Sequence, residues 1–149
     1  MDCGNAKATA MNARKSTARV LMHPTAWRKR VPIVYACSGC SSAAQMTNHV
    51  AVQLDRRNLA EMSCIAGVGG EVTHLLKMAR SGRPIVALDG CRHACVRNCL
   101  TRHGVAPTWH HVFSDYGVRR RHRADFDRDE AEVILERVLA QLPEDEAAT

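Results

Sequence analysis

The chain has 149 residues, seven cysteines and a formal net charge of +6 at pH 7. This length suits one ordinary domain that buries a real hydrophobic core. No apolar stretch approaches the roughly 20 residues of a membrane-spanning helix, and the N-terminal residues lack the continuous apolar segment of a secretory signal. Cysteines in a chain without such a signal argue against a disulfide framework, because in a reducing compartment they more often bind metal or take part in chemistry. We therefore expect a cytoplasmic protein.

The positive charge is concentrated in the first 30 residues. Residues 1–30 carry seven Lys or Arg and one Asp, whereas residues 31–149 carry fourteen basic and fourteen acidic residues. This leader lacks a periodic apolar pattern, so we expect it to be disordered. It could be a tail without a role or the product of an upstream start codon, a tether to nucleic acid or anionic lipid, or an organelle transit peptide. Apart from weak binding through the leader, a nucleic-acid partner is not expected.

From Val31 onward, short apolar runs typical of strands alternate with stretches whose apolar residues recur at helical spacing. Strands are predicted at residues 33–36, 59–65, 85–88 and 109–113. Helices are predicted at residues 43–57, 71–80, 92–102 and 127–142, with a glycine-rich loop at 66–70. The alternation favours an α/β fold: a three-layer α/β/α domain over residues 31–143 with a mostly parallel sheet of about four strands, Rossmann-like or flavodoxin-like. Residues 144–149 are expected to form an acidic disordered tail.

Three cysteines, Cys37, Cys64 and Cys91, recur at intervals of 27 residues, each close to the end of a short apolar run. This interval is roughly the length of a βαβ unit, about 30 residues. If the runs are neighbouring parallel strands, all three thiols project from the same carboxyl edge of one sheet. Because ligands bind at that edge in open α/β folds, the spacing predicts a site as well as a fold.

The cysteines have the chemistry and spacing of a zinc site, which favours four thiolate or imidazole ligands. Cys37 and Cys40 are separated by two residues, the spacing of a chelating pair. On a continuous helix Cys91, Cys95 and Cys99 would share one face, but the first and last would lie about 12 Å apart along the axis. We therefore predict that the zinc ligands are the following residues: Cys37, Cys40, Cys91 and Cys95, with Cys64 as a substitute or additional ligand. Cys99 is the weakest candidate.

The same thiols allow a second reading. Residues that follow Cys37, Cys64 and Cys91 are predicted to open helices, whose positive N-termini lower the pKa of nearby thiols. Such thiolates suit metal binding, but they also suit a thiol oxidoreductase or an iron–sulfur protein. His93 could be a further ligand, and Asp89 could orient a ligand, act as a base or cap the following helix.

A basic run at residues 119–123 could bind phosphate groups. Acidic residues follow it directly, at Asp125, Asp127, Asp129 and Glu130. Local neutralisation of the arginines is therefore the simpler expectation.

Several of these segments together resemble the DGC-domain family, small proteins named for a central Asp-Gly-Cys and expected to bind zinc. The matching motifs are Cys-Ser-Gly-Cys-Ser-Ser at residues 37–42, Cys-Ile-Ala-Gly-Val-Gly at 64–69, Asp-Gly-Cys at 89–91 with Cys95 and Cys99, and Ser-Asp-Tyr-Gly-Val at 114–118. They occur in the expected order and span about residues 32–123. The resemblance implies chelating cysteines and supplies no reaction.

Overall fold

The computed structural model describes residues 31–142 of the chain. The predictions made for the leader, residues 1–30, and for the acidic tail, residues 144–149, concern residues outside this range. The described residues form one sheet with helices on both of its faces.

The sheet has four strands, all parallel, in the order β2-β1-β3-β4. The strands are β1 (Ile33–Ala36), β2 (Glu61–Met62), β3 (Ile85–Asp89) and β4 (Trp109–Val112). The chain adds β2 on one side of β1 and then crosses to the other side for β3, so the order reverses between β1 and β3. This order agrees with the flavodoxin-like arrangement, in which ligands bind beside such a reversal at the carboxyl ends of the strands.

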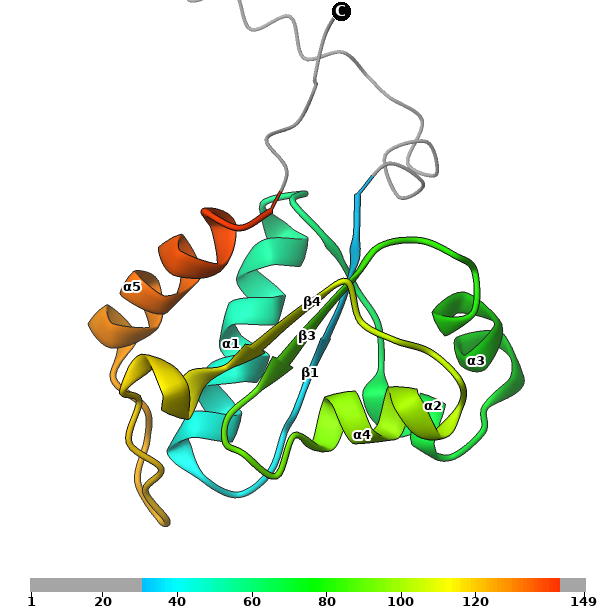
Figure 1. Ribbon diagram of the computed structural model, residues 1–149. Coiled ribbons are helices and arrows are strands. Elements are labelled where there is room, and N and C mark those ends of the chain that lie inside the picture. The colour runs from blue at the N-terminus through cyan, green and yellow to red at the C-terminus, as the bar shows by residue number, and fades with distance from the viewer. Residues whose placement is uncertain (1–30, 143–149) are drawn as a thin grey trace, which may run out of the picture.

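Helices cover the sheet on both faces, which confirms the predicted three-layer fold (Figure 1). One face carries α1 (Ser42–Arg56) and α5 (Arg128–Leu139). The other face carries α2 (Ile65–Gly69), α3 (Thr73–Ala79) and α4 (Cys95–Arg102). A short 3₁₀ helix, η2 (Phe113–Tyr116), follows β4.

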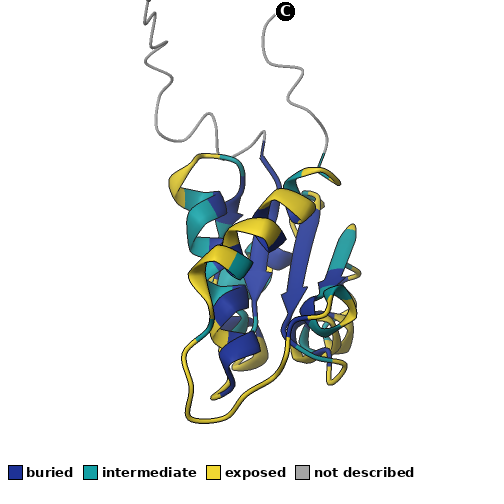
Figure 2. Ribbon diagram, turned by 90° about the vertical axis from the view of Figure 1, so that its left-hand side faces the viewer, coloured by how far each residue is buried: buried dark blue, intermediate teal, exposed yellow. Residues whose placement is uncertain are grey.

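The strands are apolar on both sides because both sides are covered. Figure 2 shows them buried between helices whose outer surfaces are exposed. Val34 and Leu88 pack in the core beneath α1 and α5, whereas Ile33, Tyr35 and Ala87 pack in the core beneath α2, α3 and α4. The alternation along each strand thus divides the apolar residues between two cores.

The predicted loop at residues 66–70 is wrong, because residues 65–69 form the short helix α2. Its glycines allow close packing against neighbouring helices. A Cβ atom at Gly69 would lie 3.2 Å from Cys99 Sγ, and one at Gly67 would meet the flexible side chain of Leu75. Close approach, rather than turn formation, is what these two glycines provide.

A histidine lies in the core below α1 and α5. His111 is 1% exposed, its Nδ1 lies 2.7 Å from the Tyr116 hydroxyl oxygen, and its Nε2 has no hydrogen-bond partner. Burial, with a smaller contribution from neighbouring His110, lowers the pKa of His111 from 6.5 to about 4. The imidazole is therefore neutral in the folded protein at neutral pH. Among residues 31–142, no helix is long and apolar enough to cross a bilayer.

The pKa of His111 predicts acid destabilisation in a defined pH range. The unfolded chain binds a proton at this residue below pH 6.5, whereas the folded chain does so only near pH 4, so the free energy of unfolding falls between these values. The full loss from this group is about 3 kcal/mol. Urea denaturation from pH 7.5 to 4 measures it. His111→Phe should remove this part of the pH dependence, and exposed His74→Gln should not; equal slopes for all three proteins would contradict the assignment.

Candidate functional site

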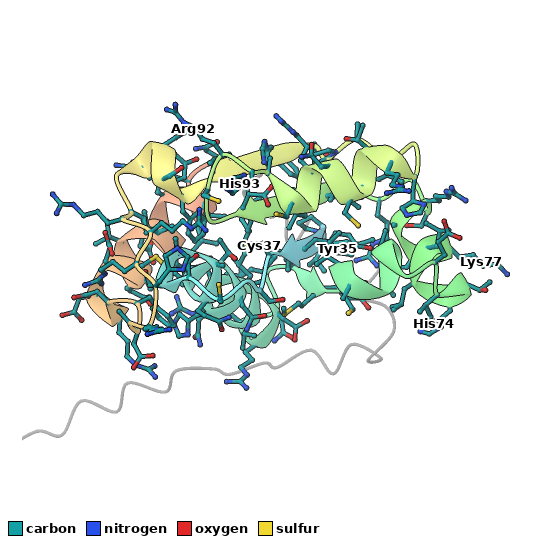
Figure 3. All side chains as sticks on the ribbon, turned by 90° about the horizontal axis from the view of Figure 1, so that it is seen from below. Tyr35, Cys37, His74, Lys77, Arg92 and His93 are labelled. Carbon is teal, nitrogen blue, oxygen red and sulfur yellow. The ribbon has the colours of Figure 1, made fainter. Side chains whose placement is uncertain are left out.

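The carboxyl edge of the sheet carries a cavity of about 370 Å³. Five cysteines line it, and they are Cys37, Cys40, Cys91, Cys95 and Cys99. Cys37 follows β1 and lies near the middle of this edge in Figure 3, with His93 on the loop beside it. Residues separated by more than 60 positions in the chain therefore meet at one site, as the 27-residue spacing predicts.

Two of the cysteines fall on unexpected sides of the prediction. Cys64 is exposed at the N-cap of α2 and is not among the residues that line the cavity. Cys99, the weakest candidate by sequence, does line it, although its Sγ lies 3.6 Å from the carbonyl oxygen of Ile65. Both assignments stay predictions, since placement near a cavity does not establish ligation.

Cys37 is fixed by the sheet and by α1. Its backbone N–H donates to the carbonyl oxygen of Leu88 at 3.0 Å, which continues the pairing of β1 with β3. The buried hydroxyl oxygen of Thr47, on α1, lies 2.7 Å from the Cys37 carbonyl oxygen and 3.6 Å from its Sγ. The backbone around this thiol is therefore held on two sides.

Cys40 precedes the cap of α1. The Ser41 hydroxyl oxygen accepts a hydrogen bond from the N–H of Ala44 at 3.3 Å, which satisfies one free donor of the first helical turn. Ser41 also forms an antiparallel bridge with His122, and Cys40 Sγ lies 3.9 Å from His122 Nδ1. The segment after η2 thus closes over the turn that carries Cys37 and Cys40.

The helix predicted at residues 92–102 is wrong at its start, because α4 begins only at Cys95. Ala94 adopts a left-handed conformation with φ 48°, and its N–H donates to the Cys91 carbonyl oxygen at 3.0 Å. Cys91 therefore lies in a turn rather than on the helix, and the expected 12 Å separation from Cys99 along one axis does not apply. Cys95 and Cys99 remain on one face of α4.

Asp89 caps α4, which is one of the three roles that the sequence left open. It is 1% exposed, and its carboxylate accepts hydrogen bonds from the N–H groups of Val96 at 2.8 Å and Arg97 at 3.2 Å. The same carboxylate lies 2.9 Å from Nε2 of His110. Sequence reasoning missed this histidine. The available signal was strand alternation, which turns His110 and His111 to opposite faces of the sheet.

The surroundings of α4 hold two thiols in their protonated form. Burial raises the pKa of Cys95, and the negative charges of Cys37, Asp89 and Cys91 raise it further. Burial also raises the pKa of Cys99, opposed by the nearby positive charge of Arg102. Neither thiol is a ready thiolate at neutral pH without a cation beside it.

The donor set fits a thiolate metal centre by its chemistry, since zinc prefers sulfur and imidazole ligands. The six cysteines within residues 31–142 are all free thiols. Within the same residues, however, no three Cys, His, Asp or Glu side chains lie close enough together to hold one ion. Metal binding therefore requires thiol side chains around the cavity to change position.

The arginines of residues 119–123 are not neutralised by the acidic residues that follow them. Ion pairs in the part of the chain that the structure describes include Arg57 with Glu132, Arg83 with Glu61, and Arg92 with Asp115, but none of these five positions. Arg121 instead contacts the backbone carbonyl oxygen of Asp125 at 3.5 Å. The expectation of local neutralisation is therefore wrong for this segment.

Comparison with known proteins gives one family and one close relative. The model of the DGC domain matches residues 33–138, which include every cysteine that lines the cavity. A protein of Pseudomonas aeruginosa named "Anaerobic and virulence modulator AnvM" is 56% identical over 112 residues, covering 73% of this chain and 86% of that protein. No solved structure matches the chain.

Replacing Asp89 by Asn should destabilise the fold through the cap of α4. The amide has one acceptor oxygen in place of two and loses the charge, so we expect a loss of about 1.5–3 kcal/mol in the free energy of unfolding. The control is Asp115→Asn, which removes the exposed ion pair with Arg92 and should cost less than about 1 kcal/mol. Urea denaturation of both variants gives the comparison. Equal losses would show that the Asp89 carboxylate is not special.

Gly90 should tolerate no side chain. A Cβ atom there would lie 2.7 Å from the backbone nitrogen of Ala44 and 2.8 Å from the carbonyl carbon of Ala43, so the end of β3 and the first turn of α1 would have to separate. We expect Gly90→Ala to cost about 1–3 kcal/mol in the free energy of unfolding. Gly39→Ala is the matched control, because its Cβ would meet only Ala44 Cβ, at 3.6 Å. Thermal and urea denaturation distinguish the two, and a neutral Gly90→Ala would contradict the close contact.

Proposed function

The chain belongs to the DGC-domain family, and from this membership we propose that it binds zinc through cysteine thiolates at the carboxyl edge of its sheet. The observation that carries the proposal is the gathering of five cysteines around one cavity. The proposed ligands remain those predicted from the sequence: Cys37, Cys40, Cys91 and Cys95, with Cys64 as a substitute or additional ligand. Cytoplasmic location is part of the same proposal.

The chain positions the proposed ligands in two pairs. Cys37 and Cys40 lie in the turn between β1 and α1, and Cys91 and Cys95 flank the left-handed turn at Ala94. The backbone of the first pair is anchored by the Thr47 and Ser41 hydrogen bonds. Zinc held by four thiolates has no open coordination position and would be structural or stored, whereas zinc held by three could activate water.

Electrostatics favour a cation at this site. Cys37, Asp89 and Cys91 each disfavour a negative charge on Cys95 in the metal-free protein. A divalent cation among these groups would reverse that balance, because it stabilises each thiolate that it contacts. The gain from relieving this repulsion would help to offset the cost of moving the side chains.

A thiol oxidoreductase or an iron–sulfur protein is the second candidate. The observation that favours it is the accessible pair formed by exposed Cys40 and half-buried Cys37, two residues apart in a turn. The raised pKa values of Cys95 and Cys99 count against those two residues as nucleophiles.

The name of the related AnvM protein suggests a cellular role. It describes an anaerobic and virulence modulator. By likeness, we propose that this chain also acts as a modulator under anaerobic conditions, with the cysteine site as its functional centre.

Metal analysis of protein purified without oxygen tests the proposal. We expect about one zinc per chain, the number that one four-ligand site holds. Serine at position 37, 40, 91 or 95 should each lower the zinc content and speed zinc release to a chelator. Cys99→Ser is the control within the same cavity and should retain the metal, while Cys64→Ser reports whether Cys64 contributes.

Other results separate the candidates. Iron with visible absorbance would support an iron–sulfur cluster. Metal-free protein with titratable thiols of low pKa would support the oxidoreductase and contradict the zinc proposal. Zinc that survives all four serine substitutions would place the metal elsewhere in the chain.

A further inference from the structure

We propose that the cavity also binds a small organic anion, a monocarboxylate whose apolar body lies against the helices and whose carboxylate pairs with Arg120. The inference rests on the proposed function only in that both use the same cavity. Arg120 lines the cavity together with the five cysteines. The carboxylate would therefore lie on one side of the thiols rather than among them.

The size and lining of the cavity suit an organic ligand. Its volume of about 370 Å³ lies within the range of small-molecule sites, about 300–1,000 Å³. Apolar side chains from three helices contribute to its wall, and they are Ala44 of α1, Ile65 and Ala66 of α2, and Val96 of α4. A single metal ion needs neither this volume nor these residues. The apolar wall also disfavours sugar phosphates, which need many polar partners.

The position of Arg120 is fixed by residues on either side of it. The Ser42 hydroxyl donates to the Arg119 carbonyl oxygen at 3.3 Å and accepts from the Arg121 N–H at 3.1 Å. The Ser42 N–H donates to the Arg121 carbonyl oxygen at 2.8 Å. One residue at the start of α1 thus holds the backbone around Arg120 beside the cavity.

The charge of Arg120 has no acidic partner among the described residues. Its Nη1 lies 3.4 Å from Nε2 of His93, which also lines the cavity. A guanidinium can only donate, so in this contact His93 is neutral and accepts. Nearby Arg92 is different, because it pairs with Asp115 at 3.1 Å. Arg120 therefore offers an unneutralised guanidinium at an apolar cavity, and carboxylate is an anion that its planar donors match.

The competing explanation is that Arg120 only balances the negative charge of a zinc–thiolate centre. The two explanations differ in what Arg120 controls. As a counter-charge, it would control zinc retention. As a recognition residue, it would control the affinity for a carboxylate and leave zinc in place.

Titration of the full-length protein with octanoate, followed by calorimetry, tests the inference, with zinc content measured in the same samples. Arg120→Gln should weaken octanoate binding about tenfold or more, the effect of one charge-assisted hydrogen-bonded contact. Arg119→Gln is the matched control: it removes the same charge from a neighbouring residue that does not line this cavity, and should change the affinity less than about twofold. Octanol, which has the same chain without the charge, should bind far more weakly. Ala66→Leu should abolish binding by filling the cavity.

Three results would overturn the inference. Equal losses for Arg119→Gln and Arg120→Gln would indicate general electrostatic attraction. Equal affinity for octanol and octanoate would remove the need for an anion site. Loss of zinc with unchanged octanoate binding in Arg120→Gln would make Arg120 a counter-charge. Conversely, octanoate binding that depends on Arg120 in protein without zinc would support this inference while the zinc proposal fails.

Discussion

The buried carboxylate of Asp89 is the interaction on which the site depends most. It ends β3, caps the first turn of α4 and contacts His110 of β4, so one side chain connects three elements. A buried charge is costly unless its hydrogen bonds are satisfied, and here three groups satisfy it. Its neighbour Gly90 lets the first turn of α1 approach the same strand end. The Asp-Gly pair thus brings helices from both faces of the sheet to one edge, and the cysteines follow from that placement.

Local pattern was sufficient to predict the layers and the edge. Strands β1 and β3 are apolar runs of the right length, and helix α1 has Met46, Val50 and Leu54 at helical spacing, all buried. The equal spacing of Cys37, Cys64 and Cys91 correctly located the carboxyl edge because each βα unit returns the chain there. Parallel pairing of all four strands required no information beyond this alternation.

The parts that escaped prediction depend on contacts between distant residues. Helix α2 contains three glycines or alanines in five residues and forms because α4 and α3 pack closely on it, which no local propensity reports. The late start of α4 follows from the left-handed Ala94, a conformation held in place where Asp89 bonds the following N–H groups. Likewise, the arginines after η2 meet the cysteine turn only through Ser42, some 77 residues earlier. Sequence could therefore identify the thiols but not their neighbours.

The cavity has walls from both layers of helices, since Ala44 belongs to α1 on one face and Val96 to α4 on the other. The two cores that the sheet keeps apart touch the same occupant there. Anything bound only by the folded chain adds its binding free energy to the stability of the whole fold. An occupant at this edge would therefore act as a clamp across the sheet, and its loss would loosen the two cores together rather than one loop alone.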